Sequence, residues 1–437
     1  MIEYDFKNQE IADIVNNMII FAVSKKASDI HFDPCEKGIR VRLRIDGMLQ
    51  DHTLVPMEYQ RNLTTRVKLI SNMNITESRL PQDGAIKGII NGIDLDMRVS
   101  SLTTNLGEKI VIRILDYTQS AEGLESLGFS DKNLVKIKKM ISVPNGIILV
   151  TGATGTGKST TVYTMLQTLN TSDTNIITVE DPIEMNIEGI NQVQVNSEIG
   201  LTFGQVLRSI LRQDPNIILI GEIRDTETAQ IAVRASITGH LVFSTIHTND
   251  SLTTIERLLD MNVERYLLSS ALTGIVSQKL ARKLCNKCKQ LRPTTLYEKT
   301  LFNKYLHQNV ENVYDINPGG CSECRNGYHG RIAVQEVLLI DDFLRDAINN
   351  EKLPREELRK LVYTENVTTM LQDGLEKVLQ GITSFEEIYK IIEIDNMESE
   401  PLPNNNDTNT DPFTEEDTKE EDLQKTEMLD LGLFQEE

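Results

Sequence analysis

The sequence has 437 residues, of which 39% are hydrophobic and 25% charged, and this length allows two or three domains with separate cores. The formal net charge of −20 at pH 7 argues against a protein that binds a nucleic-acid backbone. No apolar run approaches the roughly 20 residues of a membrane-spanning helix. Because the acidic start also lacks the features of a signal peptide, we expect a cytoplasmic protein.

The N-terminal segment mixes one helical pattern with several strand patterns. Apolar residues recur at helical spacing over residues 11–19, and residues 39–45 alternate apolar side chains with arginines, which indicates a half-buried strand. A hairpin is expected around residues 91–92. We therefore predict a smaller α+β (PAS-like) domain over residues 1–116 and a linker over residues 117–125.

Residues 126–393 alternate short apolar runs with helical patterns. Runs of this kind are typical of a parallel sheet that is covered by helices on both faces. The four runs are residues 146–150, 176–179, 217–220 and 241–246. The expected fold class is therefore α/β for this domain, with a helical C-terminal part over residues 336–393.

A complete phosphate-binding loop follows the first apolar run. Its small residues let successive N–H groups turn inward around phosphate oxygens, and the following helix adds its partial positive charge. Lys158 is expected to reach the β- and γ-phosphates of ATP, and the Ser159 hydroxyl to bind Mg²⁺. The alternative is a Gly-rich strand-to-helix turn without a ligand. The predicted nucleotide-binding residues are Gly152, Ala153, Thr154, Gly155, Thr156, Gly157, Lys158, Ser159 and Thr160.

Two acids and a histidine follow later runs of the same domain. Glu180 and Glu222 come after the second and third runs, and His247 comes after the fourth. Ligands of open parallel sheets bind beyond the carboxyl ends of the strands, so we expect both carboxylates to face the nucleotide. Either acid alone could be a solvated loop residue. His247 could hydrogen-bond the γ-phosphate or its attacking water, but for His247 and His240 a structural role is the alternative.

Four of the five cysteines form two closely spaced pairs, Cys285 with Cys288 and Cys321 with Cys324. Each pair can supply two thiolates from one tight turn, and together they complete a closed tetrahedral Zn²⁺ site. Such a site would hold residues 284–330 as a zinc subdomain too small to fold alone. Iron and four free thiols are the alternatives. Cys35 stands apart and is expected to be a core residue.

The C-terminal residues 394–437 have the composition of an acidic, disordered tail. Residues 401–437 contain 12 Asp and Glu but only 2 Lys. A short apolar patch at residues 428–434 could dock a partner as a helix, whereas the alternative is a solubilising extension. No internal repeat is present in the sequence.

Taken in order, these motifs resemble those of the secretion ATPases that drive type IV pilus assembly and type II secretion. The resemblance covers residues 10–393. It implies a RecA-like ATPase domain and a smaller N-terminal domain that contributes arginines to the nucleotide site. The matching segments are residues 152–159, 177–184, 211–225 and 238–250, with residues 28–34, 42–47, 79–84 and 107–113 in the N-terminal domain.

The resemblance also implies individual roles. Glu180 would be the general base or water-orienting residue, and Glu222 would organise Mg²⁺. Arg98 and Arg113 match the arginines that stabilise developing charge, although the residues alone would be interpreted as outward-facing strand charges. Arg79 and Arg224 are weaker candidates. A tetracysteine insertion such as that of Cys285 is a mark of assembly and secretion motors, and pilus-retraction ATPases generally lack it.

The function implied is that of a homo-hexameric ATPase motor that powers pilin assembly. It would work at the cytoplasmic face of the inner membrane, associated peripherally through a membrane platform protein and without binding nucleic acid. A type II secretion or DNA-uptake motor has the same design and stays an alternative. A RecA-like nucleic-acid translocase and a nucleotide-binding scaffold without turnover are alternatives from other classes.

Overall fold

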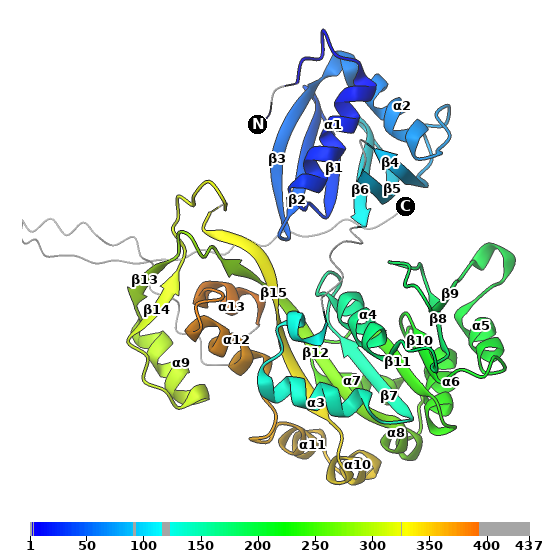
Figure 1. Cartoon of the computed structure of the whole chain (residues 1–437), viewed down its shortest axis with the longest axis vertical. Coiled ribbons are helices and arrows are strands. Elements are labelled where there is room, and N and C mark those ends of the chain that lie inside the picture. Colours follow the sequence, from blue (N-terminus) through cyan, green and yellow to red (C-terminus); the bar gives the residue numbers. More distant parts are fainter. Residues whose placement is uncertain (1, 3, 91–92, 116–122, 325, 393–437) are drawn as a thin grey trace, which may run out of the picture. The chain divides into compact units, whose positions relative to one another are not determined.

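A computed structural model of the chain describes residues 2, 4–90, 93–115, 123–324 and 326–392 (Figure 1). Contacts between residues group Met1–Glu393 into one compact unit, separate from Ile394–Glu437. The predicted acidic tail therefore lies outside the described residues, as does most of the predicted linker. Two large sheets organise the described chain, and each has its own hydrophobic core.

The N-terminal sheet has six strands in the order β3-β2-β1-β6-β5-β4, and every neighbouring pair is antiparallel. Its strands β4 and β5 pair on either side of the predicted hairpin turn, whose residues 91–92 lie outside the described chain. The elements are α1 (Ile11–Ser24), β1 (Asp29–Cys35), β2 (Gly38–Ile45), β3 (Met48–Pro56), η1 (Met57–Tyr59), α2 (Gln60–Ile70), β4 (Gln82–Ile90), β5 (Ile93–Thr104) and β6 (Gly107–Leu115).

One face of this sheet is apolar and the other carries charge. In β2, Ile39, Val41 and Leu43 are buried, whereas the arginines between them are exposed or half-buried. The alternation confirms the predicted half-buried strand, because successive side chains of a strand point to opposite faces. The buried residues of α1 and α2 join the same cluster, so both helices cover the apolar face (Figure 1).

The second sheet has seven strands in the order β15-β12-β7-β11-β10-β8-β9. All neighbours are parallel except β12 and β15. Its elements up to β12 are η3 (Leu124–Leu127), α3 (Asp131–Ile141), β7 (Gly146–Thr151), α4 (Lys158–Leu169), β8 (Ile176–Glu180), β9 (Asn191–Gln194), η4 (Ser197–Ile199), α5 (Phe203–Ile210), β10 (Ile217–Ile220), α6 (Thr226–Ile237), β11 (Leu241–Ile246), α7 (Ser251–Asp260), α8 (Arg265–Ala271) and β12 (Leu272–Leu284).

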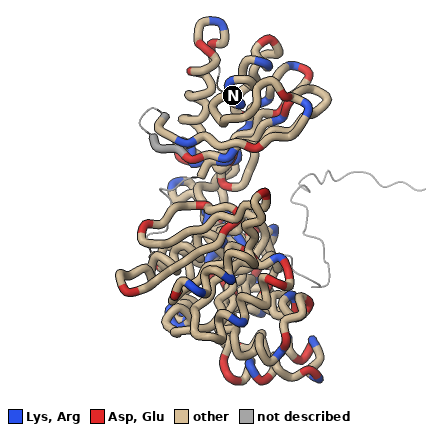
Figure 2. The backbone as a smooth tube through the Cα atoms, turned by 90° about the vertical axis from the view of Figure 1, so that its right-hand side faces the viewer, with Lys and Arg blue, Asp and Glu red and all other residues tan. Residues whose placement is uncertain are grey.

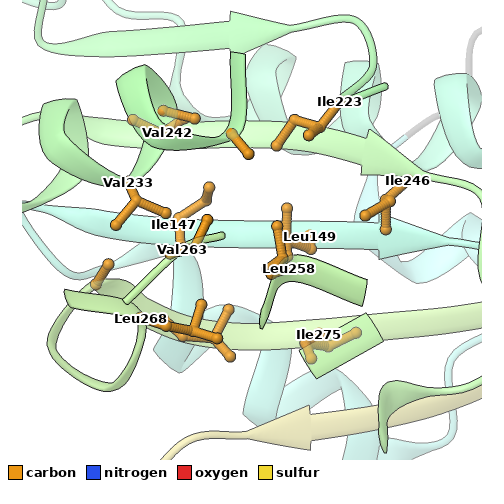
Figure 3. Close-up of a cluster of buried hydrophobic side chains, with 14 of the residues drawn as sticks. Ile147, Leu149, Ile223, Val233, Val242, Ile246, Leu258, Val263, Leu268 and Ile275 are labelled. Atoms are coloured by element: carbon orange, nitrogen blue, oxygen red, sulfur yellow. The ribbon is translucent and has the colours of Figure 1, made fainter. Parts of the chain in front are cut away.

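The four predicted strands are β7, β8, β10 and β11, and all of their residues are buried. Alternate residues of β7 enter different clusters, which shows that helices cover both faces of the sheet as predicted. On one face Ile147 and Leu149 meet Val233 of α6, Leu258 of α7 and Leu268 of α8 (Figure 3). On the other face, buried residues of α3 and α4 pack against Ile148 and Val150.

A short excursion separates β12 from β15, its antiparallel neighbour. Leu284, the last residue of β12, pairs with Tyr328, the first residue of β15. The excursion contains a two-stranded sheet and one helix. Its elements and those that follow are β13 (Gln290–Pro293), α9 (Leu296–Leu306), β14 (Asn312–Asp315), β15 (Tyr328–Leu339), α10 (Asp342–Asn349), α11 (Arg355–Val362), α12 (Met370–Leu379) and α13 (Phe385–Ile391). The helical part expected from residue 336 begins at Asp342, because residues 336–339 still pair with β12.

Charged residues of both signs are interspersed along the described chain (Figure 2). Among the described residues, no helix has the length and apolar character that crossing a membrane requires.

Candidate nucleotide site

The predicted phosphate-binding loop joins β7 to α4. Gly152, Gly155 and Gly157 have φ values of 148°, 81° and 87°, a region that side chains with a Cβ rarely adopt. A Cβ at Gly152 would also lie 2.5 Å from the backbone oxygen of Gln278. Glycine is therefore required at this position both by conformation and by space, and the loop takes the shape that its sequence predicts.

The loop presents some residues to solvent and holds others inside. Lys158 is 9% exposed, and its Nζ donates to the carbonyl oxygens of Gly152 at 2.8 Å and Ala153 at 3.0 Å. Ser159 and Thr160 are exposed in the first turn of α4. The lysine thus lies across the loop, and the hydroxyls are accessible to a ligand.

The segments that follow the parallel strands meet at one edge of the sheet, because β7, β11, β10 and β8 are neighbours in register. Thr151 Oγ1 donates to Thr248 O at 2.6 Å, so the start of the phosphate loop is joined to the segment after His247. Thr245 Oγ1 donates to Gly221 O at 2.7 Å and so fixes the residue before Glu222. These three threonines hold the edge together, and none of them was predicted as a site residue.

Glu180 is the last residue of β8 and is 3% exposed. Its carboxylate accepts hydrogen bonds from Thr178 Oγ1 at 2.6 Å, from Gln192 Nε2 at 3.1 Å and from the Tyr163 hydroxyl. Burial and the neighbouring Glu180 raise the pKa of Tyr163, which therefore stays a donor. Three donors orient both oxygens of Glu180, as an ionised carboxylate allows. Tyr163 and Gln192 were not predicted as site residues.

The structure brings Glu222 and His247 together. His247 Nε2 lies 3.4 Å from Glu222 Oε2, and Arg224 pairs with the other carboxylate oxygen. Burial lowers the pKa of Lys158, and the charge of Glu222 acts on it in the opposite direction. A carboxylate beside a histidine and an arginine, at the sheet edge that also carries the phosphate loop, fits a residue that organises Mg²⁺ beside a phosphate.

Other polar residues of these motifs have structural roles. Asp225 and Asp250 each precede a helix, and their side chains accept hydrogen bonds from the N–H groups of Thr228 and Thr253, as N-cap residues do. His240 Nδ1 lies 2.9 Å from Ala235 O, at the start of β11. His247 follows the other end of that strand, so His240 is remote from the phosphate loop.

Arg98 and Arg113 are directly opposite each other on β5 and β6. Opposite residues of antiparallel strands share a face, and like charges in this position destabilise the pair. Asp29 offsets part of the charge, because its Oδ1 lies 3.1 Å from Arg113 Nε. The pair therefore forms a concentration of positive charge on the N-terminal sheet, and its contact with a nucleotide stays a prediction. Arg79 is 85% exposed and pairs with Glu77.

The four paired cysteines form one cluster in the excursion after β12. Their Sγ atoms all lie within 4.8 Å of one another, and the Sγ atoms of Cys285 and Cys321 are 3.7 Å apart. Zn–S bonds of about 2.3 Å in a tetrahedron place sulfurs roughly 3.8 Å apart, so the thiols fit a zinc ion. Cys35, expected in the core, is half-buried at the end of β1.

Comparison with known proteins decides the family. Residues 5–390 match the model of the family described as Type II/IV secretion system protein. The chain belongs to this family. It is 44% identical over 382 residues to the type II secretion system protein E of Dickeya dadantii, covering 87% of this chain and 75% of that protein. It is 42% identical over 387 residues to the type IV pilus assembly ATPase PilB of Acinetobacter baylyi, covering 87% and 66%.

Solved structures of a pilus motor and of another ATPase share the fold. The pilus retraction motor PilT with bound ADP matches with a TM-score of 0.59 and 28% identity, covering 86% of this chain and 96% of that chain. The Legionella pneumophila ATPase DotB matches with a TM-score of 0.66 and 22% identity, covering 88% and 96%. The predicted RecA-like α/β fold is confirmed, and the protein is a secretion ATPase that hydrolyses ATP.

Proposed function

We propose that this secretion ATPase is a homo-hexameric motor that powers the assembly of type IV pilins. It would act at the cytoplasmic face of the inner membrane, bound peripherally through a platform protein. The observation that carries the assignment of the site is the meeting of the phosphate loop, Glu180, Glu222 and His247 at one sheet edge. Relatives named for pilus assembly and for type II secretion match equally large shares of the chain.

The residues at this edge supply the parts that phosphoryl transfer needs. Lys158 would move from the loop carbonyls to the β- and γ-phosphates of ATP. Mg²⁺, when bound, neutralises charge on these phosphates, and Ser159 and Glu222 are the residues that would hold it. His247, beside Glu222, would hydrogen-bond the γ-phosphate or the attacking water.

Glu180 would orient or deprotonate the attacking water. Its carboxylate is fixed by Thr178, Gln192 and Tyr163, so its direction does not depend on the nucleotide. A fixed carboxylate loses little entropy when the water binds, which favours a positioning role in the transition state.

Arg98 and Arg113 would stabilise the charge that develops on the phosphates. Side by side on one sheet face, they present two guanidinium groups, whose mutual repulsion a phosphate would relieve. Movement of the N-terminal domain against the ATPase domain would then bring the arginine pair to the nucleotide in a closed arrangement, which couples hydrolysis to mechanical work.

The tetracysteine cluster would hold a structural zinc ion. Four thiolates close the coordination shell and leave no position for a reacting water. The metal would therefore join the two ends of the excursion between β12 and β15 and take no part in hydrolysis.

The site assignment is tested by steady-state ATP hydrolysis of the Glu180→Gln and Glu222→Gln variants. Each should lose at least about 100-fold in kcat, as expected when a group acting on the reacting water or metal is removed. Asp225→Asn is the matched control, because it also replaces a carboxylate by an amide near this sheet edge and asparagine can still cap α6. Hydrolysis by both glutamate variants at the rate of the unaltered protein would refute the assignment.

Oligomeric state and load need separate measurements. Mass photometry with ATP should show six chains per particle if the motor is a hexamer. Deletion of the gene in its host should abolish surface pili. If instead secreted enzymes accumulate in the cell while pili persist, the second candidate applies, a type II secretion motor, the system for which the Dickeya dadantii relative is named.

A nucleic-acid translocase is the candidate from a different class. Acidic and basic residues are interspersed along the described chain (Figure 2), and the whole sequence carries a net charge of −20, so neither observation supports binding to a phosphate backbone. Single-stranded DNA should leave the rate of ATP hydrolysis unchanged, and a severalfold stimulation would favour the translocase.

A further inference from the structure

Gln278 lies inside the ATPase domain next to the phosphate loop. It is on β12, which runs parallel to β7 in the sheet (Figure 1), and is 1% exposed. Val276, two residues earlier, packs in the cluster that includes α4. Residues two apart in a strand share a face, so the side chain of Gln278 lies on the face of the sheet that α4 covers.

Both ends of the Gln278 amide are hydrogen-bonded to the loop and to α4. Its Nε2 donates to Thr156 O at 2.8 Å, and its Oε1 accepts from Thr161 Oγ1 at 2.9 Å. The backbone oxygen of Gln278 is the atom that leaves room only for glycine at Gly152. One residue of β12 therefore contacts the beginning of the loop, its end and the first turn of α4.

These contacts fix the direction of the peptide group between Thr156 and Gly157, whose N–H could bind a phosphate. The peptide between Thr156 and Gly157 is trans, so its C=O and N–H point in opposite directions. Because Gln278 holds the C=O of Thr156 toward β12, the N–H of Gly157 is directed away from β12. Inward-pointing N–H groups at a helix N-terminus are the elements that bind phosphate.

We propose that Gln278 is a positioning residue of the nucleotide site, which sets the Thr156–Gly157 peptide so that its N–H binds a phosphate. The proposal rests on the proposed function in one respect, namely that the loop at Lys158 binds ATP. It goes beyond the sequence motifs, because Gln278 lies 122 residues from Thr156 in the chain.

The cross-strand neighbour of Gln278 provides a matched control. Gln335 of β15 lies directly opposite Gln278, is 0% exposed and shares the same face of the sheet. Its side-chain amide has no hydrogen-bond partner among the described residues. The two glutamines thus have the same chemistry and burial, and only Gln278 contacts the phosphate loop.

The experiment compares Gln278→Met, Gln335→Met and Lys158→Ala in the full chain. Methionine keeps the length of the side chain and removes both hydrogen bonds. The measurements are the dissociation constant of ADP that carries a fluorescent ribose label, KM and kcat for ATP, and the melting temperature. Thr161→Val, which removes one of the two contacts of Gln278, is the second variant should Gln278→Met not fold.

Gln278→Met should bind labelled ADP about tenfold more weakly. The variant loses a buried hydrogen bond to Thr156 O, and the Thr156–Gly157 peptide is then no longer held in one direction. KM should rise by a similar factor while kcat stays within about threefold, because the peptide N–H contacts a phosphate in both ground and transition states. Gln335→Met should bind within about twofold of the unaltered protein, and Thr161→Val should lose about threefold.

Three results would overturn the proposal in distinguishable ways. If Lys158→Ala loses nucleotide binding and Gln278→Met does not, the loop is the site and Gln278 has no positioning role. If Lys158→Ala binds labelled ADP normally, the assignment of the loop itself fails and the proposal fails with it. Equal losses in Gln278→Met and Gln335→Met, in parallel with lowered melting temperatures, would show a general packing effect and also refute it.

Discussion

Replacing Glu336 with Gln should change how the stability of the protein depends on pH. Glu336 lies on β15, is 3% exposed and accepts a hydrogen bond from Ser251 N–H at 3.2 Å, at the first residue of α7. Burial raises the pKa of Glu336 to about 7, and the charge of Asp250 acts in the same direction. Hydrogen bonds from Ser251 and from the hydroxyl of Tyr363, 3.5 Å away, oppose this rise in pKa.

The sign follows from proton linkage. An unfolded glutamate has a pKa of 4.5 and the folded one of about 7, so the folded protein holds this proton more tightly. The contribution to stability is complete below pH 4.5 and is lost as pH rises through about 7. The whole contribution corresponds to roughly 3 kcal/mol, of which about 1 kcal/mol is lost between about pH 6 and pH 8.

Urea unfolding at pH 6 and pH 8 measures this difference and avoids the isoelectric point near 4.9. Relative to the unaltered protein, Glu336→Gln should gain about 1 kcal/mol of unfolding free energy between the two pH values. Glu298→Gln is the control, because Glu298 is also 3% exposed, and although burial acts to raise its pKa, hydrogen bonds from Arg292 lower it. Its effect should be the same at both pH values. Identical pH profiles for Glu336→Gln and the unaltered protein would refute the reasoning.

Three further changes have defined outcomes. Gly152→Ala should abolish binding of labelled ADP, because the new methyl would lie 2.5 Å from the oxygen of Gln278; binding within tenfold would contradict this. Chelation of the metal, or Cys288→Ser, should release zinc and lower the melting temperature by several degrees, because the excursion loses its cross-link; an unchanged melting temperature after complete zinc loss would exclude a structural role. Lys377→Met should cost about 3–5 kcal/mol in urea unfolding, since Asp373, 1% exposed, loses its ion-pair partner. Adding Asp373→Asn to that variant should recover much of the loss, and no recovery would indicate that packing dominates.

Local sequence patterns were sufficient for the phosphate loop. Gly152, Gly157 and Lys158 lie within one short segment, and the positive φ of the two glycines is a conformation that this residue type permits. The acids could also be placed, because a strand end is a local feature and parallel strands bring their ends to one edge. Glu222 and His247 are adjacent for this reason.

Contacts that depend on packing between distant elements could not be predicted in this way. Tyr163 lies on α4 and donates a hydrogen bond to Glu180 at the end of β8. Its position in the helical pattern is that of an ordinary core residue. Gln278 gives no local sign of its contact with Thr156. The antiparallel strand β15 was also missed as part of the sheet, because the excursion separates it in sequence from β12. Such contacts can be predicted only when the order of the strands in the sheet is known.

The pairing of Leu284 with Tyr328 has a consequence for the tetracysteine excursion. Paired residues of antiparallel strands lie about 5 Å apart, so the 43 residues between them leave the sheet and return to it at neighbouring points. In topology, β12 and β15 are a hairpin whose turn has been replaced by a metal-binding cassette. The cassette can in principle be exchanged for a tight turn without altering the register of either strand.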